Sequence, residues 1–177
     1  GDGKGPLGRS QNPPAADFQK GFIKFASVRA GSLPSDADFQ RSMRHGLRGT
    51  GMLKSGLGDA NLHQVTQYLK TFSPRWKTEE AGPVLAIQAN PHTSAEQKRG
   101  AIQKGPMISL KAGCEGCHGK VISNVQTGGF KSGTSSEALY RVIAAGIGGT
   151  GMKGQEGRLS NEDIWALVEW IRSAQNL

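Results

Sequence analysis

The sequence Cys114-Glu115-Gly116-Cys117-His118 decides how the rest of the chain is interpreted. A Cys-x-x-Cys-His sequence is the attachment signal of c-type haem, because each thiol can add across one vinyl group of the porphyrin while the adjacent imidazole reaches the iron. Two intervening residues on a single helical turn let both sulfur atoms face one porphyrin edge. The motif therefore predicts that Cys114 and Cys117 attach haem c and that His118 is an axial ligand of its iron.

Other uses of these cysteines are less well supported. The chain has two cysteines, and both lie in the motif. A structural zinc site needs four ligands, usually from a second cysteine pair or from paired histidines, whereas His45, His63 and His92 are scattered singly. A dithiol redox motif belongs to a βαβ unit, and no stretch of this sequence is long enough to build its strands.

Composition also favours a cofactor protein. Among 177 residues, 26 are glycine and 36% are hydrophobic, which is little apolar material for two ordinary cores. A buried porphyrin would add a large apolar surface for Leu, Ile, Val and Phe to pack against. The net charge of +8 favours encounter with acidic redox partners. The basic residues are dispersed singly, which argues against nucleic acid as the partner.

No apolar run approaches the roughly 18 residues of a membrane span, and no signal peptide is present. The chain also does not begin with Met. We therefore expect a mature, trimmed or incompletely recorded product, with any export signal or anchor upstream of Gly1.

In the first half, Gly1 to Pro6 is expected to form a flexible loop, and 13–18 shows no helical periodicity. Ser35 is a candidate N-cap for a helix that Gly46 would stop. A glycine turn, 49–52, displays Met52. A second helix of about a dozen residues is expected from Ala60, ending at Ser73-Pro74, with an apolar stripe formed by Leu62, Val65, Tyr68, Leu69 and Phe72.

The second half has a similar order of elements. Residues 81–93 are rich in proline and glycine and are interpreted as a linker. A helix from Ser94 to about Lys104 leads into the attachment turn, and a glycine-rich loop follows as far as Gly133. The next helix is capped by Ser135 or Ser136 and stopped at Gly146. The last helix starts at Ser160, which forms a capping box with Asp163, and its inward face carries Ile164, Leu167, Val168 and Ile171.

The two halves repeat each other. The sequences Gly46-Leu47-Arg48-Gly49-Thr50-Gly51-Met52 and Gly146-Ile147-Gly148-Gly149-Thr150-Gly151-Met152 agree at five of seven positions with an offset of 100. Beyond the methionine the offset becomes 102, which aligns Leu62 with Ile164 and Tyr68 with Trp170. A tandem duplication is indicated, and with it two domains.

Haem iron has a sixth position opposite the histidine, and a thioether there raises the potential and suits electron transfer. Met152 lies on a glycine turn between helices, where its side chain can reach the distal face, so we predict that Met152 is the second axial ligand. The alternative is that Met152 fills the core. Met107, shortly before the attachment turn, is the local competitor and is expected to pack as a core residue.

Residues 94–177 resemble a small class I cytochrome c. The matching positions are Cys114, Cys117 and His118, then Met152, with Trp165 and Trp170 as candidates for the aromatic residue that packs on the first helix. The resemblance implies an all-α fold and electron transfer through a His/Met-ligated haem.

Residues 1–80 resemble the same family with its beginning removed. Many bacterial members carry Gly-Asp-Gly-Lys-Gly shortly after the attachment motif, and this chain opens on that string. No Cys-x-x-Cys-His is present in this half. Three explanations remain open: the upstream segment was not recorded, this half lost its haem and persists as a scaffold, or another chain supplies the haem. Under the first, Met52 is the distal ligand of a second haem; under the second it is a packing residue.

Two histidines of the first half are further candidate residues. His45 could be an alternative axial ligand near Met52, but an exposed histidine at a helix end is commoner. His63 aligns with Trp165 and is expected to be structural.

The predicted molecule is thus an all-α chain of two tandem class I cytochrome c domains, 1–80 and 94–177, joined by the linker 81–93. The resemblance implies a bacterial dihaem electron carrier in the periplasm or on the periplasmic face of the inner membrane, since c-type haem is attached outside the cytoplasm. The alternatives are a cytochrome subunit of an oxidoreductase, a dihaem peroxidase, and a docking role for a haemless first half. No catalytic constellation competes in the sequence.

Overall fold

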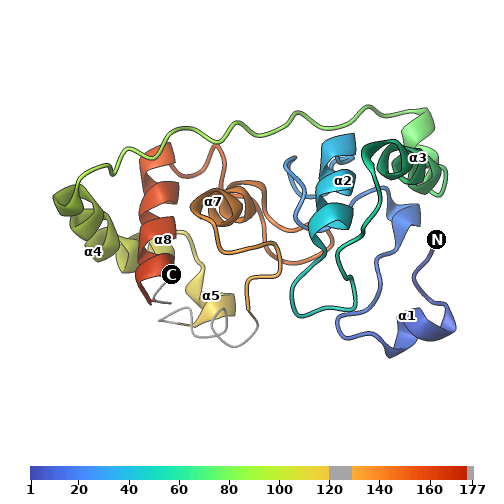
Figure 1. Cartoon of the computed structure of the whole chain (residues 1–177). Coiled ribbons are helices and arrows are strands. Elements are labelled where there is room, and N and C mark those ends of the chain that lie inside the picture. Colours follow the sequence, from blue (N-terminus) through green and yellow to red (C-terminus); the bar gives the residue numbers. More distant parts are fainter. Residues whose placement is uncertain (120–128, 175–177) are drawn as a thin grey trace.

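The fold is described from a computed structural model, which defines residues 1–119 and 129–174 (Figure 1). The helices are α1 (Pro6–Ser10), α2 (Asp36–His45), α3 (Asp59–Lys70), α4 (Ala95–Lys111), α5 (Glu115–His118), α7 (Ser136–Ala145) and α8 (Asn161–Ala174), with 3-10 turns at Phe18–Lys20 and Pro74–Lys77. In these two ranges β pairing is limited to isolated bridges. The predicted all-α fold is confirmed.

Side-chain caps fix where the main helices begin. The hydroxyl of Ser35 accepts the N–H of Asp38, and the Asp38 carboxylate accepts the N–H of Ser35, which closes the capping box of α2. Ser135 caps α7 by accepting the N–H of Ala138 at 3.2 Å. At the start of α8, the Ser160 hydroxyl donates to the Asp163 carboxylate at 2.8 Å and accepts the N–H of Asp163 at 3.1 Å. Each of these caps satisfies backbone donors that a helix start leaves unpaired, and the predictions at these starts are confirmed.

The second half is built on α8, which packs against both α4 and α7. The predicted inward face is confirmed: Ile164, Leu167 and Val168 are at most 2% exposed. Gly105 of α4 lies directly under Trp170, because a Cβ atom at Gly105 would come within 2.4 Å of the Trp170 Cβ. Trp170 is therefore the aromatic residue that packs on the first helix of this half. The indole of Trp165 instead donates to the carbonyl of Gln88 at 3.0 Å.

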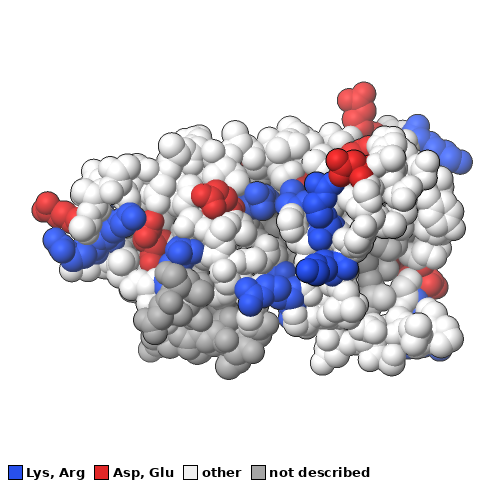
Figure 2. All heavy atoms as spheres, in the orientation of Figure 1, with Lys and Arg blue, Asp and Glu red and all other residues white. Residues whose placement is uncertain are grey.

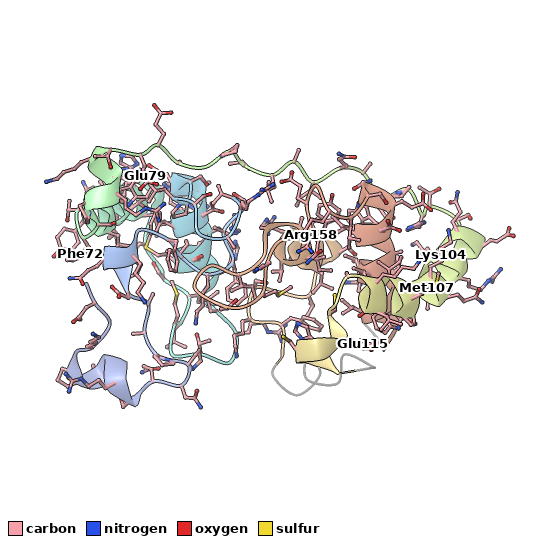
Figure 3. The ribbon with its side chains drawn as sticks, turned by 180° about the vertical axis from the view of Figure 1, so that it is seen from behind. Phe72, Glu79, Lys104, Met107, Glu115 and Arg158 are labelled. Carbon is pink, nitrogen blue, oxygen red and sulfur yellow. The ribbon has the colours of Figure 1, made fainter. Side chains whose placement is uncertain are left out.

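Two expectations for α4 are wrong. The helix does not end near Lys104 but continues through Pro106 to Lys111. Burial of Ala101, Gly105 and Ile108 along this helix offsets the backbone hydrogen bond that proline removes. The side chain of Met107 is 53% exposed instead of lying in the core. In Figure 3, Met107 and Lys104 lie on α4 at the end of the molecule remote from the first half.

The first half has a smaller core, formed by Ile23, Ala26, Val28 and Phe39 with α3 packed against α2. Leu62 is fully buried, as the predicted stripe requires, but Tyr68 is 63% exposed. Comparison of the two halves explains the exposure of Tyr68. Its counterpart Trp170 is covered by α4, whereas no helix of the described residues covers α3 in this way. The short helix α1 was also not predicted; it begins with proline, which is favourable at a first helical position.

The segment between α3 and α4 crosses both halves as an extended strap, here defined as residues 81–93 (Figure 1). It bonds to the first half through Gly82 N–H to Leu33 O at 2.9 Å and Leu85 N–H to Ser27 O at 2.7 Å. Toward α8, the amide of Asn90 donates to Glu169 at 2.7 Å. The segment that was interpreted as a linker is thus hydrogen-bonded along its length to both halves.

The two halves also touch directly along a seam between α2 and α7. The N–H of Ala30 donates to Ala145 O at 2.8 Å, and the N–H of Arg48 donates to Lys131 O at 3.0 Å. Gly148 lies so close to the first half that a Cβ there would come within 2.8 Å of the Ile23 carbonyl oxygen. Backbone therefore packs on backbone at the seam.

Candidate functional site

The attachment motif folds into one helical turn. Gly113, with φ of 75°, ends α4, and the N–H of Cys114 donates back to Ser109 O at 3.0 Å. The N–H groups of Cys117 and His118 both donate to Cys114 O, at 3.2 and 3.0 Å. Residues three apart lie on the same side of a helical turn, so the turn has the arrangement that the motif predicts for its two sulfur atoms.

The Met152 turn is held by its own side chains and backbone. The N–H of Ile147 donates to Met152 O at 3.0 Å, and the Thr150 hydroxyl both donates to Ile147 O at 2.8 Å and accepts the N–H of Met152 at 3.1 Å. Gly146 permits this closure, because a Cβ there would lie 2.6 Å from Met152 O and its φ is 77°. The local sequence therefore determines the position of Met152.

These two elements meet at one cavity of about 490 Å³. Cys114, Cys117, His118 and Met152 all line it. Its apolar walls come from α7, α8 and the loop before α7, and include Phe130, Leu139, Val142, Ile143, Leu167 and Ile171. The structure thus brings together all four residues that the sequence singled out in this half.

This donor set fits haem c. Two thiols can form the thioether links, imidazole and thioether are the usual axial pair of an electron-transfer haem, and the walls are apolar. Lys131, Lys153 and Arg158 also line the cavity and place positive charge beside it. Figure 3 shows Arg158 near the middle of the molecule and Glu115 on the attachment turn below it.

Arginines from the two halves lie close enough for their charges to interact. Burial lowers the pKa of Arg141 on α7, and the nearby positive charge of Arg41 on α2 lowers it further. Arg41 and Arg141 are equivalent residues of the repeat, 100 positions apart. Figure 2 shows Lys and Arg side chains gathered across the middle of this face, between α7 and α2.

The remaining candidates stand apart from this cavity. Met107, the competing thioether, is on the exposed side of α4 and does not line it. His45 and His63 are exposed on α2 and α3, and neither lines either of the two cavities described here. His92 is buried beside α8, where its N–H donates to the side chain of Asn90 at 2.9 Å. Most of the predicted glycine-rich loop after His118 lies outside the described residues.

Met52 lies in a second cavity, of about 790 Å³, in the first half. Its turn has the same hydrogen bonds as the Met152 turn: Leu47 N–H to Met52 O at 2.9 Å, Thr50 hydroxyl to Leu47 O at 2.7 Å, and Met52 N–H to the Thr50 hydroxyl at 3.1 Å. Seven lining residues of this cavity are the repeat equivalents of seven that line the first. Phe39, Ser42, Met43, Leu47, Gly51, Met52 and Leu69 correspond, in this order, to Leu139, Val142, Ile143, Ile147, Gly151, Met152 and Ile171.

Sequence reasoning missed Phe25, which lines both cavities. No local pattern marks it, because its position depends on how the two halves meet. No helix within the described residues is both long and apolar enough to cross a membrane.

Comparisons with known proteins agree with this site. Residues 100–171 match the family described as cytochrome C oxidase, cbb3-type, subunit III. A chain of the Kuenenia stuttgartiensis reducing HAO-like protein complex Kustc0457/Kustc0458 is similar in structure, with a TM-score of 0.89 and 26% sequence identity; the match covers 98% of the present chain and 87% of that chain. No curated protein matches the sequence. With the attachment turn and the methionine turn on one apolar cavity, these matches support a c-type cytochrome domain in residues 100–171, with haem c as its cofactor.

Proposed function

We propose that this electron-transfer cytochrome carries two haem groups, one in each half, and passes single electrons between protein partners in the bacterial periplasm or on the periplasmic face of the inner membrane. In the second half, Cys114 and Cys117 hold the cofactor, and His118 and Met152 are its axial ligands. In the first half, Met52 is the distal ligand. Bound haem supplies the change between ferrous and ferric iron, and the chain supplies its attachment, its axial ligands and an apolar surrounding.

One observation carries this proposal: the two cavities share a set of equivalent lining residues and carry identically bonded methionine turns. A half that persisted only as a scaffold has no need for an apolar cavity of about 790 Å³ with a thioether at its wall. Residues 1–80 and 94–177 would each be a class I cytochrome c domain.

Covalent haem per polypeptide tests the proposal. Intact mass and a pyridine haemochrome spectrum of the untruncated protein are expected to give two haem groups per chain. One haem would reject the second site and leave residues 1–80 as a scaffold or docking unit. Haem that is present in the second cavity, in the first half, but not covalently linked to this chain would point to supply by another chain.

A second candidate function is that of an electron-transfer subunit in an oxidoreductase. The observation that favours it is the similarity to a chain of a protein complex, the reducing HAO-like complex, over nearly the full length of the present chain. Affinity purification from the native source, followed by mass spectrometry, is expected to yield a stoichiometric redox partner. Recovery of the cytochrome alone would favour a free carrier.

A dihaem peroxidase is disfavoured because methionine turns are present at both cavities, whereas a peroxidase needs one haem with an open sixth position. Purified protein is expected to be low-spin in the ferric state and to show no peroxide turnover. A high-spin resting spectrum would reverse this preference.

A further inference from the structure

The two cavities share a wall. Phe25, Lys131 and Ile147 line both of them. The Met152 turn contributes to both as well, since Gly151 and Met152 line the first cavity and Thr150 lines the second. A single layer of side chains therefore separates the two cavities at the seam.

Phe25 is held in this wall by an unusual backbone. Its φ is 61°, in the left-handed region that residues other than glycine seldom adopt. The Arg41 guanidinium donates to Phe25 O at 2.9 Å and to the Asp38 carboxylate at 2.6 Å. Asp38 is fully buried and also accepts the N–H of Ser27 at 2.8 Å. A strained conformation of this kind persists only where surrounding bonds enforce it, and these bonds hold the chain at the Phe25 carbonyl and two residues later at Ser27.

The other side of the wall is equally fixed. Ile147 begins the hydrogen-bonded Met152 turn, and Lys131 O accepts the N–H of Arg48 from the first half. Gly149, in the same turn, lies under Phe22, where a Cβ would come within 2.7 Å of the ring. The wall therefore consists of residues from both halves, and the backbone of Lys131 is bonded across the seam to Arg48.

We propose that Phe25 is a positioning residue for electron exchange within the chain: its ring fills the partition between the two haem cavities and sets how fast an electron crosses from one to the other. This inference rests on the proposed second haem. The step is balanced, because one electron leaves a ferrous iron in one cavity and reduces a ferric iron in the other, with no bond or proton transferred. The Phe25 ring and the Ile147 side chain give this partition an apolar part beside Lys131.

Phe25→Gly is the sharpest test, because glycine adopts a φ of 61° without strain and the substitution removes the ring while keeping the backbone. The full-length, fully loaded protein would be oxidised and then photoreduced with less than one electron per chain. Redistribution of that electron between the two irons is expected to slow by roughly tenfold, which corresponds to about 1.4 kcal/mol in activation free energy. Ile147→Ala removes side-chain atoms from the same partition on the side of the other half. It is also expected to slow the electron exchange.

Met107→Ala is the control. Met107 is 53% exposed on α4 and lines neither cavity, and Figure 3 shows it at the end of the molecule remote from the first half. Its loss is expected to leave the exchange rate unchanged. Haem absorption spectra and midpoint potentials are recorded for all variants. Because they report on the axial ligands, they distinguish a change at the ligands from a change in the partition.

Two results would overturn the inference. If the protein holds two haem groups and both wall variants exchange electrons at the wild-type rate, the partition role fails while the proposed function stands. If intact mass shows one haem per chain, the second site and the partition fail together.

Discussion

At the scale of single residues, Met152 has the most direct spectroscopic consequence. Replacing Met152 with Ala should leave haem attached through Cys114 and Cys117 and remove the sulfur-to-iron charge-transfer band that this site contributes in the ferric state. Its reduction potential should fall, because a thioether ligand favours ferrous iron. Met107→Ala is the control, since Met107 is exposed on α4 and lies outside the cavity. A band from the second site that survives in Met152→Ala would reject the ligand assignment.

Asp38 is the residue on which the first half depends for stability. Burial alone would raise the pKa of its carboxyl group, but hydrogen bonds from Ser27 and Arg41 outweigh burial and hold the pKa below its ordinary value of 3.8. Because the ionised form is favoured in the folded state, this stabilisation is present above pH ~4 and is lost as pH falls through the lowered pKa.

Asp38→Asn is therefore expected to cost about 3 kcal/mol in unfolding free energy at pH 7, because it leaves Arg41 without its buried partner. The loss should shrink as the pH falls below about 4. Asp36→Asn on the same helix is the control: Asp36 forms a partly exposed pair with Lys70, and its loss should cost under about 1 kcal/mol. Denaturant unfolding between pH 3 and 7 measures the unfolding free energy of both variants. Equal losses of unfolding free energy in Asp38→Asn and Asp36→Asn would contradict the role of Asp38.

At the scale of elements, the crossing of α4 and α8 is set by Gly105. Gly105→Ala would press a methyl group against Trp170 and is expected to lower the unfolding free energy by about 2 kcal/mol. Gly100→Ala, one and a half turns earlier in α4, meets open space and should raise stability by about 0.5–1 kcal/mol, because alanine favours helix. Thermal or denaturant unfolding of the two variants measures whether the unfolding free energy falls in Gly105→Ala and rises in Gly100→Ala.

The elements also show what sequence could and could not predict. Caps are local, so Ser35, Ser135 and Ser160 were identified from a few neighbouring residues. The exposure of Tyr68 and the length of α4 depend on which helix packs against which, and neither follows from periodicity alone. The wall around Phe25 joins residues more than 100 positions apart, and no spacing rule connects them. The roles of Met152 and Met52 remain predictions that the haem count and the ligand variants test.

At the scale of the whole molecule, the net charge of +8 predicts how partners bind. Lys and Arg gather across the seam (Figure 2), near both cavities. Affinity for an acidic redox protein is expected to fall as salt rises from 20 to about 200 mM, because the Debye length shortens over this range. Surface plasmon resonance at several ionic strengths measures this affinity. An affinity that is flat across this range would show that charge does not guide docking.

The strap, residues 81–93, has a mechanical consequence. Two units joined by a free tether move relative to each other, and any exchange between them then waits for diffusion. Here the tether is itself bonded to Leu33 and Ser27 on one side and to Glu169 on the other, and the seam adds backbone bonds of its own. The two cavities therefore keep one separation and one orientation as the molecule tumbles. Solvent viscosity should slow the arrival of a partner but leave the passage of an electron inside the chain unaffected.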